Sequence, residues 1–372
     1  MPELPANLPD WISAISQLLL VLIFVALFTG ANQRLQVYLW SRDIRAKLNI
    51  LEAFAGEARK KTLEYMASSG AKEAESTLKR LTDFFVISPV DIEPVDIIRR
   101  LEHLVNLRQR RFKEEVAKIM PESDDVVRSK AEVAVEITSA LTFISKFVRH
   151  LLLTGEKTRN WILIMQLQLL MPLILKMADT YRRALYDFLK GVPIGDSAGP
   201  MVALRLAGVD ASWERIEEET VYTVKRIDGR EVYIVKAEGP GSSVGRPGSA
   251  TERLIEKLVA GGKKPRLLIT VDAALKLEGE ESGSVAEGVG AAIGDIGPEK
   301  IRFERVSVKY GIALRAVAIK MSLEEAILGM NEKIARGVEK AVETVRSMIS
   351  RESREGDVVV VVGVGNTVGV GQ

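Results

Sequence analysis

The sequence predicts a mixed class of protein: an N-terminal transmembrane helix, a cytoplasmic helical bundle, and a C-terminal layered α/β domain with glycine-rich loops. Three observations carry this prediction. An uncharged apolar run occupies residues 11–29, helical periodicity with few breakers continues to about residue 190, and short β-rich runs then alternate with glycine-rich loops. Single cores rarely exceed roughly 250–300 residues. We therefore expect three parts in this chain of 372 residues, namely 1–33, 34–190 and 191–372.

Composition excludes several kinds of chemistry. The chain has no cysteine, so disulfides, thiolate catalysis and cysteine zinc sites are excluded. Its two histidines, His103 and His150, both fall in helical sequence, which excludes a Ser-His-Asp triad within the C-terminal part. Residues 31–190 carry a net charge of +6 and residues 191–372 a net charge of −2. Because basic and acidic residues are interleaved, without an aromatic-rich basic stripe, no nucleic-acid partner is expected.

The N-terminal run "WISAISQLLLVLIFVALFT" is long enough to span the hydrocarbon of a bilayer. Only Glu3 and Asp10 are charged before it, whereas four basic residues follow it closely: Arg34, Arg42, Arg45 and Lys47. The positive-inside rule places the tail outside and the rest in the cytoplasm. A cleaved signal peptide is the alternative, but the run lacks a basic start and a small-residue cleavage site. We expect a single-pass protein of the cell membrane, with the lipid bilayer as partner through residues 11–29.

The next part of the sequence reads as helices. Residues 34–68 continue from the anchor, "SGAKEAESTLKRLTDFF" follows, and Pro89 and Pro94 mark a break. Three further helices are expected. The first follows Asp96 and ends before Pro121, the second begins at the capping residues near 123, and the third covers roughly 157–190. The basic cluster Arg108, Arg110, Arg111 and Lys113 is expected to be a solvated helix face, with a membrane or partner contact as the alternative.

A second apolar run covers residues 161–177, "WILIMQLQLLMPLILKM". It is interrupted by Gln166, Gln168 and Pro172, and basic residues flank both ends. We expect a core helix of the bundle. A second membrane crossing stays open, and it would move the C-terminal domain outside.

The part after Gly191 alternates strands and helices. Its expected elements are a hairpin around Asp228-Gly229, a helix at 250–262, a buried strand at 265–272, strands at 301–309 and 313–321, a long helix at 322–352, and a terminal strand of five valines.

The two ends of this part complement each other. The sequence "VVVVVGVGNT" is a strand and loop with no helix after it, whereas "GDSAGPMVALRLAG" is a loop and helix with no strand before it. Domain termini often lie close together. We therefore predict that the terminal strand inserts into the sheet and that its loop packs against residues 195–200.

The joined unit resembles hydrogenase-maturation endopeptidases and the spore germination protease. The matching pieces are "GVGNT" at 363–367, Asp196 in "GDSAGP", and Asp272 in "ITVDAAL". The resemblance implies that Asp196 and Asp272 face each other as an active site, either as metal ligands or as an acidic pair. Lys309 in "VSVKYG" stands where the endopeptidases have a third, histidine, ligand. Over its whole length the chain also looks like an archaeal membrane-protein family known only as a domain of unknown function, which implies the architecture and no activity.

Two close carboxylates either share a proton or bind a hard divalent cation such as Mg²⁺. The candidate catalytic residues are therefore Asp196, Asp272 and Lys309, with the two aspartates as candidate metal ligands and Lys276 as a second cation that offsets their charge. The alternative is structural, in which Asp196 caps a helix and Asp272 binds backbone amides in a turn.

Glycine clusters in one domain suggest a ligand cleft at the sheet edge, with tight turns as the alternative. The candidate ligand-binding residues are Gly195, Gly199, Gly241, Arg246, Lys276, Gly363, Gly365, Asn366 and Thr367. Two functions stay open: a membrane-tethered, peptidase-like hydrolase, and a non-catalytic ligand-binding or assembly module at the membrane. Homo-oligomer formation is also left open.

Overall fold

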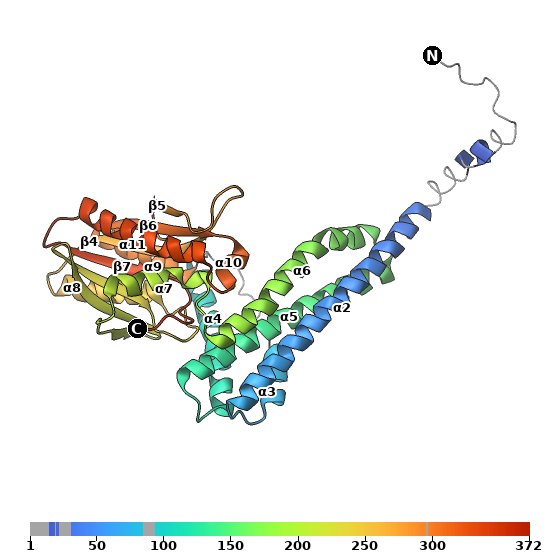
Figure 1. The fold of residues 1–372 in the computed structure, drawn as a ribbon, viewed down its shortest axis with the longest axis horizontal. Coiled ribbons are helices and arrows are strands. Elements are labelled where there is room, and N and C mark those ends of the chain that lie inside the picture. The colour runs from blue at the N-terminus through green and yellow to red at the C-terminus, as the bar shows by residue number, and fades with distance from the viewer. Residues whose placement is uncertain (1–14, 19, 22–30, 85–93, 295–296) are drawn as a thin grey trace, which may run out of the picture. The chain divides into compact units, whose positions relative to one another are not determined.

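The computed structural model describes residues 15–18, 20–21, 31–84, 94–294 and 297–372 (Figure 1). Most of the predicted membrane anchor, residues 11–29, therefore lies outside the described residues. The chain forms two compact units. The first combines the chain up to Ala55 with Leu141–Ala178, and the second combines Gly56–Ala140 with Asp179–Gln372.

The first unit is a bundle of three helix segments, from α2 (Ala31–Ser68), α5 (Asp125–Thr158) and α6 (Trp161–Lys190). All three helices continue into the second unit. Ion pairs Arg45–Glu156 and Arg149–Glu52 hold α2 and α5 antiparallel. Gln168 of α6 donates a hydrogen bond of 2.6 Å to Asp43 of α2. The buried side chains between them include Ile44, Leu48, Leu51, Val148, Leu152, Ile164, Leu167 and Met171.

The helical part of the second unit adds α3 (Ala74–Thr82) and α4 (Pro94–Ile119) to the far ends of α2 and α5. One apolar cluster joins the four helices, and its buried members are Met66, Leu78, Leu81, Phe112, Val116, Ile119, Met120, Ala131 and Val135. A buried hydrogen bond of 2.9 Å between the hydroxyls of Thr62 and Thr138 ties α2 to α5.

The α/β part is a sheet with helices on both faces. Its described strands are β1 (Glu214–Glu217), β2 (Thr220–Ile227), β3 (Arg230–Ala237), β4 (Pro265–Leu275), β5 (Val285–Val289), β6 (Ala313–Met321) and β7 (Val358–Gly363). They form one seven-stranded sheet in the order β1-β2-β3-β7-β4-β6-β5. The pairs β3·β7, β4·β7 and β4·β6 are parallel, and the others are antiparallel. The sheet is therefore mixed.

Two apolar cores cover the two faces of this sheet. Helices α7 (Ala198–Ala207) and α11 (Glu332–Glu352) pack on one face, and α8 (Pro247–Ala260) and α9 (Pro298–Tyr310) pack on the other. The valines of β7 alternate between the cores, with Val359 and Val361 in the first and Val358, Val360 and Val362 in the second. A strand buried on both faces reads as a continuous apolar run, which is why five valines predicted it.

Three sequence expectations need correction. Residues 301–309 are helical within α9, because Pro298 starts a helix that buries Phe303 and Val306. The long helix expected at 322–352 is two helices, α10 (Leu323–Ile327) and α11, since Ser322 and Asn331 each cap a new start. The core helix expected at 161–177 has an exposed outer face on which Leu169 keeps 71% of its surface. Among the described residues, Trp161–Lys190 is the helix long and apolar enough to cross a membrane.

Candidate functional site

The terminal loop packs against the start of α7, as the sequence predicts. The Asn366 N–H donates to Oδ2 of Asp196 at 2.9 Å. Gly365 has a φ of +130° and packs against the carbonyl oxygen of Asp196. A Cβ at this position would overlap that oxygen and would lie 3.3 Å from Cδ of Pro200. Gly363 lies against the backbone of Gly199 in the same way. The insertion of β7 between β3 and β4 and the packing of its loop are therefore confirmed.

Asp196 and Asp272 come together at the carboxyl edge of the sheet, where Asp272 is buried and Asp196 is half-buried. Asp272 keeps 5% of its surface, and its Oδ1 accepts the Ala273 N–H at 2.7 Å. Burial, reinforced by repulsion from Asp196, raises the pKa of Asp272 well above its ordinary value. Burial also raises the pKa of Asp196, and the Asn366 N–H opposes that rise. Burial and the neighbouring carboxyl group therefore both favour the neutral form of Asp272 over its charged form.

The pair offers two carboxylates to a cation, and part of their capacity to bind one is already used. Magnesium in proteins is usually held by one or two carboxylates and several waters, whereas calcium takes about six to eight oxygen ligands. Backbone N–H groups already occupy Asp196 and Asp272, so part of their ligating capacity is used. Across the described parts of the chain, no group of three or more His, Asp or Glu side chains is placed to hold a metal ion. Asp272 thus accepts backbone N–H groups, as the structural alternative expected, but it does so within strand β4 and not in a turn. Asp196 binds the terminal loop instead of capping a helix.

The two candidate lysines do not join the aspartates. Lys309 lies near the end of α9, and α9 leads directly into the start of β6. Because β6 runs parallel to β4, this start lies at the amino edge of the sheet, whereas Asp272 lies toward the carboxyl edge. The exposed ammonium group of Lys309 pairs with Glu256 of α8 at 2.7 Å. The expectation that Lys309 joins the aspartates as a catalytic residue is wrong, because its stretch forms a helix that ends at the opposite edge of the sheet. Lys276 follows β4, donates to the Glu280 carbonyl at 3.4 Å, and contributes to the lowered pKa of Glu325.

The candidate glycines mark close backbone packing. A Cβ at Gly199 would lie 2.5 Å from the Val271 carbonyl oxygen, so only glycine lets α7 approach the sheet. Gly195 lies against the backbone of Glu325, and Gly241 lies close to Ser129 of α5. These contacts agree with the alternative of tight packing at Gly195 and Gly199.

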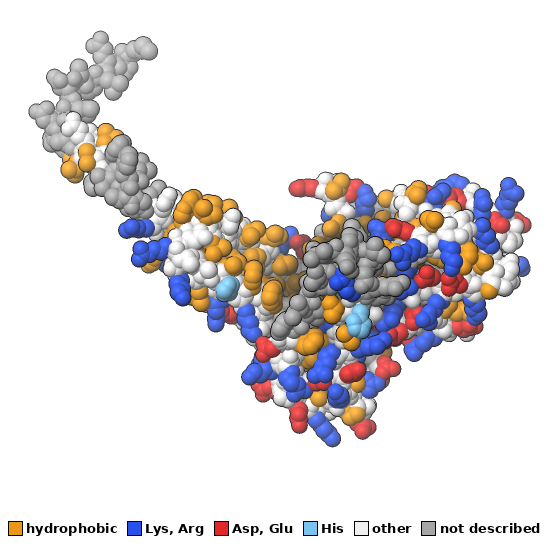
Figure 2. Space-filling model, turned by 180° about the vertical axis from the view of Figure 1, so that it is seen from behind, with side chains coloured by type: hydrophobic (Ala, Val, Ile, Leu, Met, Phe, Trp, Pro, Cys, Tyr) orange, Lys and Arg blue, Asp and Glu red, His pale blue; other side chains and the backbone are white. Residues whose placement is uncertain are grey.

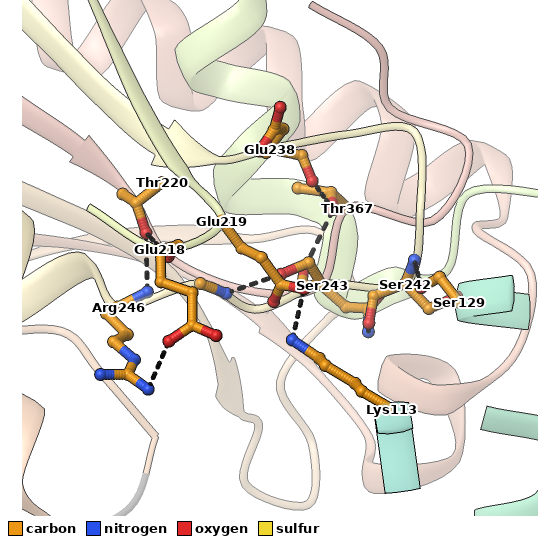
Figure 3. Close-up of polar contacts among 12 residues, drawn as sticks. Lys113, Ser129, Glu218, Glu219, Thr220, Glu238, Ser242, Ser243, Arg246 and Thr367 are labelled. Atoms are coloured by element: carbon orange, nitrogen blue, oxygen red, sulfur yellow. Dashed lines mark hydrogen bonds and ion pairs between the residues drawn. The ribbon is translucent and has the colours of Figure 1, made fainter. Parts of the chain in front are cut away.

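Thr367 and Asn366 hold a loop of the α/β part, residues 239–246. The Thr367 N–H donates to the Ser243 carbonyl at 2.9 Å, and the Asn366 side-chain amide donates to the Ser242 carbonyl at 3.2 Å. The Arg246 N–H donates to Oγ1 of Thr220 at 2.7 Å. The terminal loop therefore fixes the shape of the 239–246 loop (Figure 3).

This loop forms one wall of a cavity of about 260 Å³, and helices α4 and α5 form the other wall. The cavity lies wholly within the second unit. Figure 3 shows Lys113 reaching from the helices toward Glu219 and Ser243. Its lining is Asn106, Gln109, Arg110, Phe112, Lys113, Ser129, Glu132, Val133, Glu136, Phe188, Glu218, Glu219, Ser242, Ser243, Val244, Gly245, Arg246 and Asn366.

Most charges in the cavity wall are paired. Lys113 forms an ion pair with Glu219, which also accepts the Ser243 hydroxyl at 2.7 Å. Arg246 pairs with Glu218 at 2.7 Å. The Ser242 N–H donates to Oγ of Ser129 at 2.8 Å, which joins the loop to α5.

Two charged groups in the wall have no partner among the described residues. Glu132 makes no hydrogen bond or ion pair with a described residue. Burial raises the pKa of its carboxyl group to about 7; attraction by Lys113 opposes this rise, and repulsion from Glu219 and Glu136 adds to it. The exposed guanidinium of Arg110 likewise has no partner in the described chain. The Ser242 hydroxyl is buried without a hydrogen bond. The cavity therefore offers a carboxyl group, a cation and several amide and hydroxyl groups to a small polar molecule.

The sequence pointed to only part of this cavity. Arg246 and Asn366 were among the candidate ligand-binding residues, and both line it. Glu132, Arg110 and Lys113 were missed because they lie on helices whose tertiary partner was not evident. The signal that could have found Arg110 and Lys113 was the basic cluster at residues 108–113, where Lys113 pairs with the α/β part.

Comparison with known proteins places the chain in a family. Residues 18–191 match the model described as protein of unknown function (DUF1512) N-terminal domain, and residues 194–371 match domain of unknown function (DUF1512) C-terminal. No curated protein matches the chain. The two models together cover nearly the whole sequence, so the chain belongs to the DUF1512 family.

Proposed function

We propose that this protein is a membrane-anchored, non-catalytic ligand-binding module whose ligand occupies the cavity between α4, α5 and the 239–246 loop. The observation that carries the proposal is the pair of unpartnered groups in the cavity wall, Glu132 and Arg110. An ionised carboxylate attracts an ammonium group, and a guanidinium binds carboxylate or phosphate through paired hydrogen bonds. The ligand class that satisfies both is a small zwitterion, such as an amino acid.

Cavity size and polarity support this class. Sites for drug-sized ligands measure about 300–1,000 Å³. A volume of about 260 Å³ suits a smaller molecule. The side-chain amides of Asn106 and Gln109 add hydrogen-bonding groups, and Phe112 and Phe188 add apolar surface.

Helix α5 belongs to both units and provides a route from this cavity to the first unit. Four residues of α5 line the cavity, namely Ser129, Glu132, Val133 and Glu136. The same helix continues to Thr158 in the first unit. A ligand that contacts α5 therefore biases a continuous element that leads toward the predicted anchor.

The membrane part of the proposal rests on the sequence. Residues 11–29 span the bilayer, the N-terminal tail lies outside, and the domains after residue 33 are cytoplasmic, because the basic residues follow the apolar run. Described residues within that run are helical and carry the exposed apolar side chains Ile15, Leu18, Leu20 and Val21.

The direct test is calorimetric titration of the detergent-solubilised full chain with the common L-amino acids, each compared with its matching monoamine and monocarboxylate. We expect one amino acid or a small set to bind. Glu132→Gln and Arg110→Gln should each weaken that binding about tenfold or more, since hydrogen bonds to charged groups contribute about 1.5–3 kcal/mol. Glu114→Gln is the matched control, because Glu114 is exposed on α4 and does not line the cavity.

The pH dependence gives a second readout. Since the pKa of Glu132 is raised to about 7, its carboxylate forms as pH rises through that value, and affinity for the ammonium group should rise with it. In Glu132→Gln this dependence should disappear. If no zwitterion binds, or if both cavity variants bind as well as wild type, the assigned ligand class is wrong.

A hydrolase acting through Asp196 and Asp272 is the second candidate. The raised pKa of Asp272 beside Asp196 favours it, because a proton shared between two carboxyl groups supplies an acid and a base. Burial of Asp272 and its bonds to backbone N–H groups weigh against it. Peptide hydrolysis that is lost in Asp272→Asn while the variant stays folded would make this candidate the better account.

A further inference from the structure

The terminal loop contributes one residue, Asn366, to the wall of the cavity. Three hydrogen bonds fix this residue. Its backbone N–H donates to Oδ2 of Asp196 at 2.9 Å, and its side-chain oxygen accepts the Val368 N–H at 2.8 Å. Its side-chain amide donates to the Ser242 carbonyl at 3.2 Å. The Asn366 side chain therefore has one orientation, with its oxygen toward Val368 and its nitrogen toward Ser242.

The amide nitrogen of Asn366 has a second hydrogen that the protein does not use. An asparagine amide carries two N–H donors. One of them is bonded to the Ser242 carbonyl, and no described residue accepts the other. The hydroxyl of Ser242, in the same wall, is buried without a hydrogen bond to any described residue. Because a buried polar group without a partner costs free energy, a ligand that forms hydrogen bonds at this wall is favoured.

The outer surface offers little selection by charge. On the face of the α/β part that Figure 2 shows, basic and acidic side chains are interspersed. Such a surface creates no large field of one sign that would steer an anion or a cation. For a small molecule that arrives over this face, selection therefore depends on the groups that line the cavity.

The free hydrogen of Asn366 suits one end of a zwitterion. A carboxylate accepts hydrogen bonds, whereas an ammonium group only donates them. We propose that Asn366 is the specificity-determining residue of the α/β wall and that its amide donates to the carboxylate of the bound amino acid. Asp196 does not line the cavity and acts through Asn366 as its positioning residue. The Asn366 contact rests on the ligand class of the proposed function, whereas the positioning role of Asp196 is testable without a ligand.

Asn366→Asp tests the ligand contact. The aspartate keeps an oxygen that accepts the Val368 N–H, but it puts a carboxylate oxygen where the amide nitrogen stood. The detergent-solubilised full chain is titrated calorimetrically with the common L-amino acids and their matching monoamines. We expect the affinity for the bound amino acid to fall about tenfold or more relative to the affinity for its monoamine. A general disturbance of the loop would weaken both ligands alike, so an unchanged ratio overturns the assignment.

The matched control for this variant is Asn160→Asp. Asn160 accepts the Leu163 N–H through its side-chain oxygen at 3.1 Å, and it does not line the cavity. Both variants therefore keep an oxygen that accepts a backbone N–H and add one negative charge. Asn160→Asp should leave the ratio of the two affinities as it is in wild type.

Asp196→Ala tests the positioning role in the absence of ligand. Hydrogen–deuterium exchange of the full chain should become faster in residues 364–368 and 239–246, because Asn366 loses the acceptor that fixes it. Asp196→Asn should exchange like wild type, since its amide oxygen can accept the same N–H. Asp357→Ala is the matched control, because Asp357 is also half-buried and accepts a backbone N–H at 2.8 Å. It should leave both segments unchanged, and unchanged exchange at 239–246 in Asp196→Ala overturns the positioning role.

The two measurements separate this inference from the proposed function. If wild type binds none of the amino acids, the proposed ligand class fails and the Asn366 contact fails with it, whereas the exchange result still decides the role of Asp196. If wild type binds an amino acid but Asn366→Asp keeps the ratio, the ligand class stands and the Asn366 contact falls. Asn366→Asp leaves the bond to Asp196 in place, so it decides the contact even if Asp196→Ala does not fold.

Discussion

The packing of α7 on the sheet can be tested at a single glycine. In Gly199→Ala the added Cβ would lie 2.5 Å from the carbonyl oxygen of Val271 and nearer still to that of Val364. Both obstacles are backbone atoms of the central strands or their ends, so no side chain can rotate away. Ordinary contact begins at 3.4 Å. The helix must therefore move by about 1 Å, which loosens the contacts of Val202, Ala203 and Leu206 with the sheet.

Overpacking of this kind costs typically 1–3 kcal/mol, and we expect about 3 kcal/mol because the clash is with backbone. For a domain of this size that loss lowers Tm by about 6–12 °C. Thermal unfolding of the full chain in detergent, followed by circular dichroism, measures it. Gly261→Ala is the control, since its nearest atoms are at 3.5 Å, and it should change stability by no more than about 0.5 kcal/mol. Equal Tm values for Gly199→Ala and the control would refute the reasoning.

Two further predictions concern buried ionisable groups. Lys236 is fully buried, and burial lowers the pKa of its ammonium group from 10.5 to about 8. Below about pH 8 the buried ammonium form therefore destabilises the fold. This destabilisation decreases as pH rises from about 8 toward 10.5. Lys236→Met should therefore be more stable than wild type by about 3 kcal/mol at pH 7, with a difference that shrinks above pH 8 in denaturant titrations; a constant difference would contradict this. Burial, then repulsion from Asp196, raises the pKa of Asp272 above 3.8, so wild type should lose stability as pH rises above that value. Asp272→Asn should remove this loss and raise Tm at neutral pH, whereas exposed Asp210→Asn should not, and a lower Tm for Asp272→Asn would point to a required negative charge.

Local patterns predicted most of the fold. Strand β6 was predicted with the observed bounds, and β4 was predicted with the observed start but with an end at Asp272, three residues before the observed end. The strand β7 and its insertion were predicted from two incomplete units at opposite ends of the α/β part. Residues 301–309 were predicted as a strand because apolar and polar residues alternate there. The segment is a helix, and Pro298 and Gly311 are the residues that mark its start and end.

The candidate site was predicted less completely. Proximity of Asp196 to the terminal loop followed from joining the two ends, whereas burial of Asp272 depends on loop packing that no local pattern reveals. Glu132 could not be selected, since it is one charged residue among many on an amphipathic helix, and Arg110 was predicted only as part of a solvated basic cluster. Only the tertiary contact of α4 and α5 with the 239–246 loop gives them a cavity.

The position of β7 has a consequence for biosynthesis. It is the last strand of the sheet to be translated, yet it lies between β3 and β4 and contributes valines to both cores. Until the ribosome has supplied residues 358–363, β3 and β4 each keep an open edge, and such edges are templates for aggregation. A nascent chain that stalls before Val358 therefore lacks the strand that joins β3 to β4 in the sheet. Chaperone protection should be needed until the final valines emerge.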